Sequence, residues 1–222
     1  MSNRIKNEIV KSEEAGQPCK RPYDLGKRQE ASSRTRDAVL AAAQAQLEVG
    51  GVRELTMQSL AKASGVTRQT IHNLFGTKPA LLEALFDRLA MDAGMMRMRD
   101  VMMEPDGNSM LAAMVEVFTG FWSQQRMILK RIHGLAAIDP EFGRAVEARN
   151  RRRHGIATRV IERLYGGRPE IGVEERARKV ACLVALTSFE FFDQMIETCG
   201  DVERAAEYVL SVVRMVLCRS QT

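Results

Sequence analysis

Side chains that can hydrogen-bond to bases and phosphates are concentrated between Thr67 and Asn73. Arginine can donate two hydrogen bonds to guanine, and glutamine or asparagine can pair with adenine. Threonine hydroxyls and the free N–H groups at a helix N-terminus are suited to phosphate oxygens. Plain solvent exposure is the alternative for these residues. The segment therefore predicts nucleic-acid contact through Thr67, Arg68, Gln69, Thr70, His72 and Asn73.

A helix-turn-helix is the element expected to position these side chains. Thr56 and Thr67 are suited to cap two short helices, and each can contact phosphate while it does so. Gly65 supplies the left-handed conformation that the sharp turn between them requires. The small Ala61 lets the two helix backbones approach closely. The wedge between the helices is expected to hold Leu60, Val66, Ile71 and Leu74.

Helical patterns cover the rest of the chain, and no strand pattern competes with them. The predicted fold class is therefore all-α. Structure is expected to begin at Ser32–Ser33, and glycines or prolines mark most of the later breaks. The further helices are expected from Ser33 to Gly50, from Thr77 onward, and over Ser109–Leu135, Pro140–Tyr165, Val173–Cys199 and Asp201–Arg219.

The stretch from Arg34 to Phe86 carries a recognisable series of motifs. They are the helix TRDAVLAAAQAQLEVGG, the Leu55–Thr56 entry to the next helix, and SLAKASGVTRQTIHNLFGTKPALLEALF. This stretch resembles the DNA-binding domain of the tetracycline-repressor (TetR) family. In that family the recognition helix runs into a Phe, a short loop with a Lys, and a Leu-Leu helix. The matching residues here are Phe75, Lys78, Leu81 and Leu82.

The resemblance implies a transcriptional regulator, most often a repressor. Such a protein binds a near-palindromic double-stranded DNA operator as a homodimer and is released by a small-molecule effector. The resemblance also implies that Lys78 contacts phosphate. The expected organisation is a mobile polar arm at 1–33, a three-helix helix-turn-helix domain at 34–80, and a helical effector-binding and dimerisation bundle at 81–222.

The dimer contact implied by the resemblance lies in the last two helices. Both carry apolar residues on more than one stripe, and such helices are buried on more than one side. These residues are Val180, Ala181, Val184, Phe191 and Met195 in one helix, and Ala205, Ala206, Val209, Val212, Val213 and Val216 in the other.

Two positions depart from the family pattern. His72 stands where the family usually has a tyrosine, and Leu74 stands where it often has a histidine or tyrosine. The alternative function is therefore a helical sensor or binding protein that has lost specific DNA recognition. Such a protein would bind DNA weakly, without sequence preference and with a steep dependence on salt.

Effector-contacting residues are expected inside the C-terminal bundle. Phe118 and Trp122 are four residues apart on one helix face, and with Phe189 they are candidates for a ligand pocket. Ordinary core packing is the alternative for all three. The basic run Arg149, Arg151, Arg152, Arg153 and His154 is interpreted as a solvated helix face. A contact with an acidic effector or partner is the alternative for this run.

Composition excludes several other classes. The 222 residues carry a net charge of +5, of which residues 1–90 contribute +4 (fourteen Lys and Arg against ten Asp and Glu). A basic end of this kind permits a polyanion partner. The four cysteines form no CxxC pair, and no membrane span, cofactor fingerprint or nucleophile–base motif is present. We expect a cytoplasmic protein that is not an enzyme, with no cofactor, metal or membrane partner.

Overall fold

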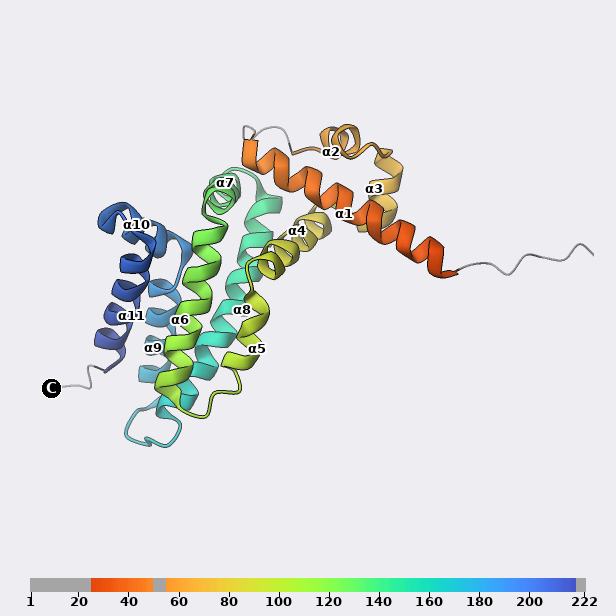
Figure 1. The fold of residues 1–222 in the computed structure, drawn as a ribbon. Coiled ribbons are helices and arrows are strands. Elements are labelled where there is room, and N and C mark those ends of the chain that lie inside the picture. The colour runs from red at the N-terminus through yellow and green to blue at the C-terminus, as the bar shows by residue number, and fades with distance from the viewer. Residues whose placement is uncertain (1–24, 50–54, 219–222) are drawn as a thin grey trace, which may run out of the picture.

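The structure, a computed structural model, describes residues 25–49 and 55–218 (Figure 1). Every regular element in these ranges is a helix, which confirms the all-α class. A small N-terminal group of helices packs against one end of a larger bundle. None of the described helices is long and apolar enough to span a lipid bilayer.

The N-terminal group consists of α1 (Leu25–Val49), α2 (Met57–Ser64) and α3 (Arg68–Phe75). The side chains of Thr56 and Thr67 cap α2 and α3 by accepting hydrogen bonds from the N–H groups of Ser59 and Thr70. Gly65 adopts φ +70° at the turn between α2 and α3. The predicted helix-turn-helix is therefore present, with the expected caps and turn.

The first helix begins earlier than expected. It starts at Leu25 rather than at Ser32–Ser33, so residues 25–33 are helical rather than part of the predicted arm. The Oγ1 of Thr35 donates to the carbonyl of Ala31 at 2.8 Å, one helical turn back. The described side chains of residues 26–33 are exposed, so no apolar periodicity marks this part of α1 in the sequence. The rest of the arm, residues 1–24, lies outside the described residues.

The C-terminal bundle contains more helices than the sequence predicted. A break at Gln125 divides the expected Ser109–Leu135 helix, and a break at Thr187–Ser188 divides the expected Val173–Cys199 helix. The bundle consists of α4 (Lys78–Asp92), η1 (Met95–Arg97), α5 (Met98–Val101), α6 (Gly107–Gln124), α7 (Arg126–Ala136), α8 (Pro140–Tyr165), α9 (Val173–Leu186), α10 (Phe189–Cys199) and α11 (Val202–Cys218).

Figure 1 shows α4 running from the helix-turn-helix into the bundle, where it packs against α8. Helices α10 and α11 lie on the side of the bundle away from α1–α3. On α11 the buried stripe comprises Ala205, Val209, Val213 and Leu217. Tyr208, Met215 and Val216 on the same helix are exposed. Part of the apolar surface of α11 is therefore used inside the protomer, and part remains uncovered.

Helices α6 and α8 touch at Gly107. A Cβ atom on this residue would lie 2.9 Å from Cδ2 of Leu164 and 3.0 Å from its Cα and backbone N. Because two of these atoms belong to the backbone, a side chain at this position would force the helices apart. Glycine is therefore required by the close approach of the helices.

We expect Gly107→Ala to lower the free energy of unfolding by about 1–3 kcal/mol, the usual cost of overpacking. Gly155→Ala on α8 is the matched control, since a Cβ there meets nothing within 4 Å. In a helix interior that change should stabilise the protein by about 0.5–1 kcal/mol. Urea denaturation of both variants measures the difference. Equal midpoints would contradict the close approach.

Candidate DNA interface and ligand cavity

Helix α3 has a buried face and an exposed polar face. Ile71 and Phe75 are buried against the helix-turn-helix core, whereas Arg68, Gln69, His72 and Asn73 are exposed. The Nε2 of Gln69 donates to Oδ1 of Asn73 at 2.9 Å, which orients both amides on the outer face. The exposed side chains of α3 are thus the ones predicted to contact bases.

Five of the eight predicted DNA-contact residues line one hollow on the surface of the helix-turn-helix. They are Thr67, Arg68, Gln69, His72 and Lys78, and Met57 and Gly76 complete the lining. Asn73 and Thr70 lie on α3 outside this lining, and Thr56 caps the neighbouring helix. The exposed hydroxyl of Thr56 accepts from the N–H of Ser59 at 3.0 Å. Contact of all eight residues with DNA stays a prediction.

Lys78 has protein partners in addition to its place beside the hollow. Its Nζ lies 2.8 Å from Oδ2 of Asp139 and 3.2 Å from Oε2 of Glu141. Burial tends to lower the pKa of Lys78, but the two carboxylates outweigh it and raise the pKa above its usual value. Hydrogen bonding by Lys78 lowers the pKa of Asp139. This ion-pair cluster joins the start of α4 to the start of α8.

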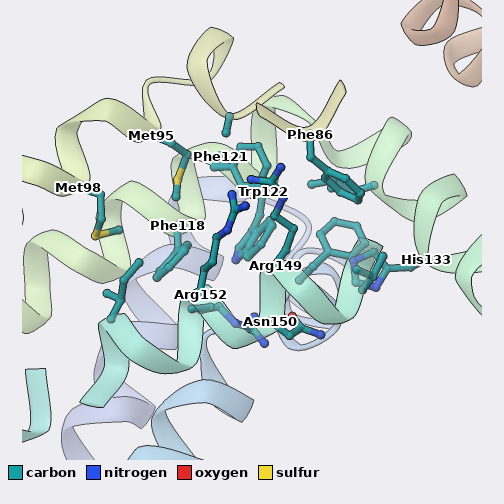
Figure 2. Close-up of a pocket in the computed structure, with 16 residues that line it drawn as sticks. Phe86, Met95, Met98, Phe118, Phe121, Trp122, His133, Arg149, Asn150 and Arg152 are labelled. Carbon is teal, nitrogen blue, oxygen red and sulfur yellow. The ribbon is translucent and has the colours of Figure 1, made fainter. Parts of the chain in front are cut away.

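A cavity of about 240 Å³ lies in the bundle, between α4, η1, α5, α6, α7, α8 and α10. Phe118, Trp122 and Phe189, the three predicted pocket residues, all line it. The rings of Phe118 and Trp122 stack with centroids 5.8 Å apart, and the ring of Phe189 meets Trp122 edge-on at 5.9 Å. Figure 2 shows Phe118 and Trp122 close to Arg149 and Arg152 around one space. Ligand contact by the three residues stays a prediction.

The basic run on α8 forms the polar wall of this cavity. Arg149, Asn150, Arg152 and Arg153 line it, and the interpretation of the run as a solvated face is wrong for Arg149 and Arg153, which are partly or fully buried. Arg151, Arg152 and His154 are exposed and fit that interpretation, although Arg152 also borders the cavity. The physical reason is position, because Arg149 and Arg153 share the inward face of α8 with Phe142 and Val160.

Arg149 connects the cavity to α4. Its Nη2 lies 2.9 Å from Oε2 of Glu83 and donates to the carbonyl of Glu83 at 2.7 Å. Its Nη1 lies 2.7 Å from Oδ1 of Asp87. Arg152 is 3.5 Å from the same two carboxylates. Two arginines of α8 and two acids of α4 thus form a balanced cluster, here called the α4–α8 tether.

Comparison with known proteins identifies the N-terminal domain. Residues 39–85 match the family model described as bacterial regulatory proteins, tetR family. Over these residues the chain is similar to the tetR family. No curated protein matches the sequence. The resemblance predicted from Arg34 to Phe86 is confirmed over the matched residues.

Two solved structures share the fold of most of this chain. A transcriptional regulator from Saccharomonospora viridis, in complex with choline, superposes with a TM-score of 0.60 at 15% identity, covering 82% of this chain and 96% of that chain. A transcriptional regulator from Rhodococcus sp. Rha1 superposes with a TM-score of 0.55 at 15% identity, covering 83% and 96%. The helical bundle therefore belongs to the same fold as the bundles of these regulators.

Among the cavity-lining residues, the sequence patterns predicted the aromatic ones and missed the arginines. Arg153 is only 8% exposed, and its Nη1 donates to the carbonyl of Thr187 at 3.0 Å. Burial lowers the pKa of Arg153, and the charge of Glu190 opposes that shift.

Among residues 25–49 and 55–218, no three His, Cys, Asp or Glu side chains are grouped to hold a metal ion.

His133 and Glu190 form a close side-chain pair beside the cavity. The Nδ1 of His133 lies 2.6 Å from Oε1 of Glu190, and His133 itself is part of the lining. The hydrogen bond from His133 lowers the pKa of Glu190 to about 2, against an opposing effect of partial burial. This pair joins α7 to α10.

The pKa of Glu190 predicts a pH-dependent contribution to stability. Because the folded pKa lies below the usual value of 4.5, the contribution is present above pH 4.5 and is lost as pH falls toward 2. The Glu190 side chain is 63% exposed, so solvent screening limits the contribution to about 1 kcal/mol. Urea denaturation should show Glu190→Gln less stable than wild type near neutral pH. The two should converge at about pH 2–3. A difference that does not change with pH would contradict the ion pair.

Proposed function

We propose that the chain is a ligand-responsive transcriptional repressor. It binds a near-palindromic operator as a homodimer and is released when a small molecule occupies the bundle cavity. The observation that carries this proposal is the position of α4. This helix follows the recognition helix directly, and two of its residues, Phe86 and Ala90, form part of the cavity wall. A ligand in the cavity would therefore contact the helix that positions the DNA-binding domain.

The uncovered apolar surface of α11 supports the homodimer. Tyr208 is 57% exposed and Met215 is 55% exposed, on the side of α11 opposite its buried stripe. We propose that a second copy covers this surface through α10 and α11, with two-fold symmetry. A dimer would place its two recognition helices about 34–36 Å apart, in successive turns of the major groove.

The α4–α8 tether supports a route from the cavity to DNA. Arg149 and Arg152 line the cavity and also hold Glu83 and Asp87 of α4. A ligand that attracts these arginines would weaken their ion pairs with Glu83 and Asp87. The position of α4, and with it the separation of the recognition helices, would then change. A coupling of about 1–3 kcal/mol is typical and would lower operator affinity roughly 5- to 150-fold.

Choline, the ligand of the Saccharomonospora viridis regulator, would meet an unfavourable charge here. The cavity of this chain is lined by Arg149, Arg152 and Arg153 and by no acidic residue of the described parts. A cation in this space would be repelled, whatever the attraction of the aromatic rings. We expect no choline binding.

Selection of bound duplexes from a random DNA pool tests the proposal. At about 0.15 M salt, a specific dimeric regulator should enrich an inverted repeat. Binding that vanishes with rising salt and enriches no sequence would favour a sensor without specific DNA recognition. His72 motivates that alternative because it occupies the exposed face of α3. Leu74 gives no support to that alternative, since its side chain packs against the core.

Arg68→Ala is expected to weaken binding to the selected operator by about 1–3 kcal/mol and to relax preference at one base pair. Lys78→Ala is the contrast, and it should weaken binding to all duplexes alike. Loss of a phosphate contact at Lys78 would reduce the slope of log affinity against log salt by about 0.9. Affinity measured on the operator and its single-base variants gives both results. If Arg68→Ala binds the operator as specifically as wild type does, Arg68 does not contact a base.

A further inference from the structure

Arg153 is a buried cation with no directly paired carboxylate among the described residues, although the charge of Glu190 acts on it from a greater distance. More than nine-tenths of its surface is covered, and its Nε is buried with no hydrogen-bond partner. Its hydrogen bond goes to the carbonyl of Thr187, which also accepts from Nε1 of Trp122 at 3.2 Å. No carboxylate in residues 25–49 and 55–218 forms an ion pair with it. A buried charge without a carboxylate at ion-pair distance is costly, so this position is suited to an anion from outside the chain.

The other arginines of the cavity lining are already paired. Arg149 and Arg152 face Glu83 and Asp87, two cations against two anions. Glu190 accepts a hydrogen bond from His133. Arg153 is therefore the one arginine of the described lining without a directly paired carboxylate, which favours a ligand with a single anionic group. With no acidic residue in the described lining, the same space disfavours a cation.

The remaining walls set the size and character of the ligand. The cavity of about 240 Å³ is larger than an engineered apolar cavity of about 150 Å³ that binds benzene. Apolar side chains line most of it, among them the rings of Phe86, Phe118, Trp122 and Phe189. A ligand of this volume would consist of one small ring or a short aliphatic chain with a single polar head.

We propose that the cavity binds a compact apolar monocarboxylate, with its carboxylate at Arg153 and its apolar body among the aromatic rings. This assignment rests on the proposed function and names the class of its effector. A carboxylate at Arg153 can accept hydrogen bonds from the guanidinium, including the unpartnered Nε, in the geometry that arginine favours for such anions. Arg149 and Arg152 lie in the same wall, so the anion would also compete with Glu83 and Asp87.

Trp122, the only tryptophan of the chain, makes the cavity observable by fluorescence. The experiment titrates the full chain with phenylacetate, phenylacetamide and phenethylamine, which share one frame and carry charges of −1, 0 and +1. We expect phenylacetate to quench or shift the emission and to bind about 10- to 100-fold more tightly than the amide. The amine should bind more weakly than the amide. Equal binding of acid and amide, tighter binding of the amine, or no binding of any probe would overturn the proposal.

Arg153→Met identifies the residue that holds the head group. This variant should bind acid and amide equally, with the affinity for the amide unchanged. Arg151→Met is the matched control, since the Arg151 side chain is 67% exposed outside the cavity and should keep the preference for the acid. If Arg153→Met does not fold, the wild-type series still decides the ligand class. Arg152→Gln then tests the same wall and should reduce the preference. An unchanged preference in the folded cavity variant would overturn the assignment.

Failure of this inference is distinguishable from failure of the proposed function. Duplex selection uses the protein without ligand and reports the helix-turn-helix alone. An enriched inverted repeat together with no preference for the acid would leave a regulator whose effector belongs to another chemical class. Carboxylate binding without an enriched sequence would leave a carboxylate-binding protein without specific DNA recognition.

Discussion

Ile71→Ala is expected to lower the free energy of unfolding of the DNA-binding domain by about 2–5 kcal/mol and to abolish operator binding. Ile71 is 0% exposed and lies on the inner face of α3. Its removal leaves a cavity between short helices of only eight residues each, which have few other contacts to compensate. The side chains predicted to contact DNA are untouched, so the loss of binding would result from misplacement of α3.

Two probes separate local from global unfolding in this experiment. Far-UV circular dichroism follows all helices, whereas fluorescence of Trp122 follows only the C-terminal bundle. In Ile71→Ala the dichroism should develop an early transition, and the fluorescence midpoint should stay where it is in wild type. His72→Ala is the matched control. His72 is the exposed neighbour of Ile71, and its change should alter stability by no more than about 0.5 kcal/mol. Coincident, unshifted transitions in Ile71→Ala would contradict the packing of α3.

The helix-turn-helix could be predicted closely because its signals are local. Thr56, Thr67 and Gly65 fix two helix starts and the turn between them by hydrogen bonding and backbone conformation alone. Each of these signals acts within four residues, so no knowledge of tertiary packing was needed. The start of α1 at Leu25 was missed for the opposite reason, since its first turns are exposed and show no apolar pattern.

The breaks inside the bundle could not be predicted because they have tertiary causes. At Gln125 the chain has neither glycine nor proline, yet α7 turns away from α6 and packs against α1 and α8. There Arg131 donates to the carbonyl of Leu47 at the end of α1. Arg126 pairs with Asp193 and Glu197 of α10, and both contacts require the turn. No sequence feature near Gln125 indicates these contacts with distant residues.

The arginines of the cavity were missed although a signal for them existed. On α8 the buried residues Phe142, Ala145, Ala157 and Val160 follow a helical period. Arg149 and Arg153 lie on that same stripe, four residues apart, where a solvated face would place neither. The charge of the run along the sequence does not show the direction of each side chain. The inward direction of these two arginines follows from their positions around the helix. A cation on an apolar stripe indicates a buried partner or a ligand.

The α4–α8 tether leads to the second large expected effect. Arg149→Met should lower the free energy of unfolding by about 2–4 kcal/mol, less than a fully buried pair because Asp87 is solvent-exposed. The substitution removes the hydrogen bonds to Glu83 and Asp87 and the stacking of the guanidinium over Phe86, which lies 5.4 Å away. A double-mutant cycle with Glu83→Gln, followed by urea denaturation, should give a coupling energy of about 1–3 kcal/mol. Additive effects of the two changes would exclude the tether.

The same variant separates a structural tether from a signalling one. If occupation of the cavity acts by drawing Arg149 away from α4, Arg149→Met should reproduce the effect of the ligand. Its operator affinity without ligand should then fall toward the value of ligand-bound wild type, and added phenylacetate should change it little. Arg151→Met, whose exposed pair with Glu147 contributes less than about 1 kcal/mol, should keep the wild-type affinity and response. A stability loss in Arg149→Met without any change in the response to ligand would make the tether a purely structural contact, and the signal would then have to reach α4 through Phe86 and Ala90.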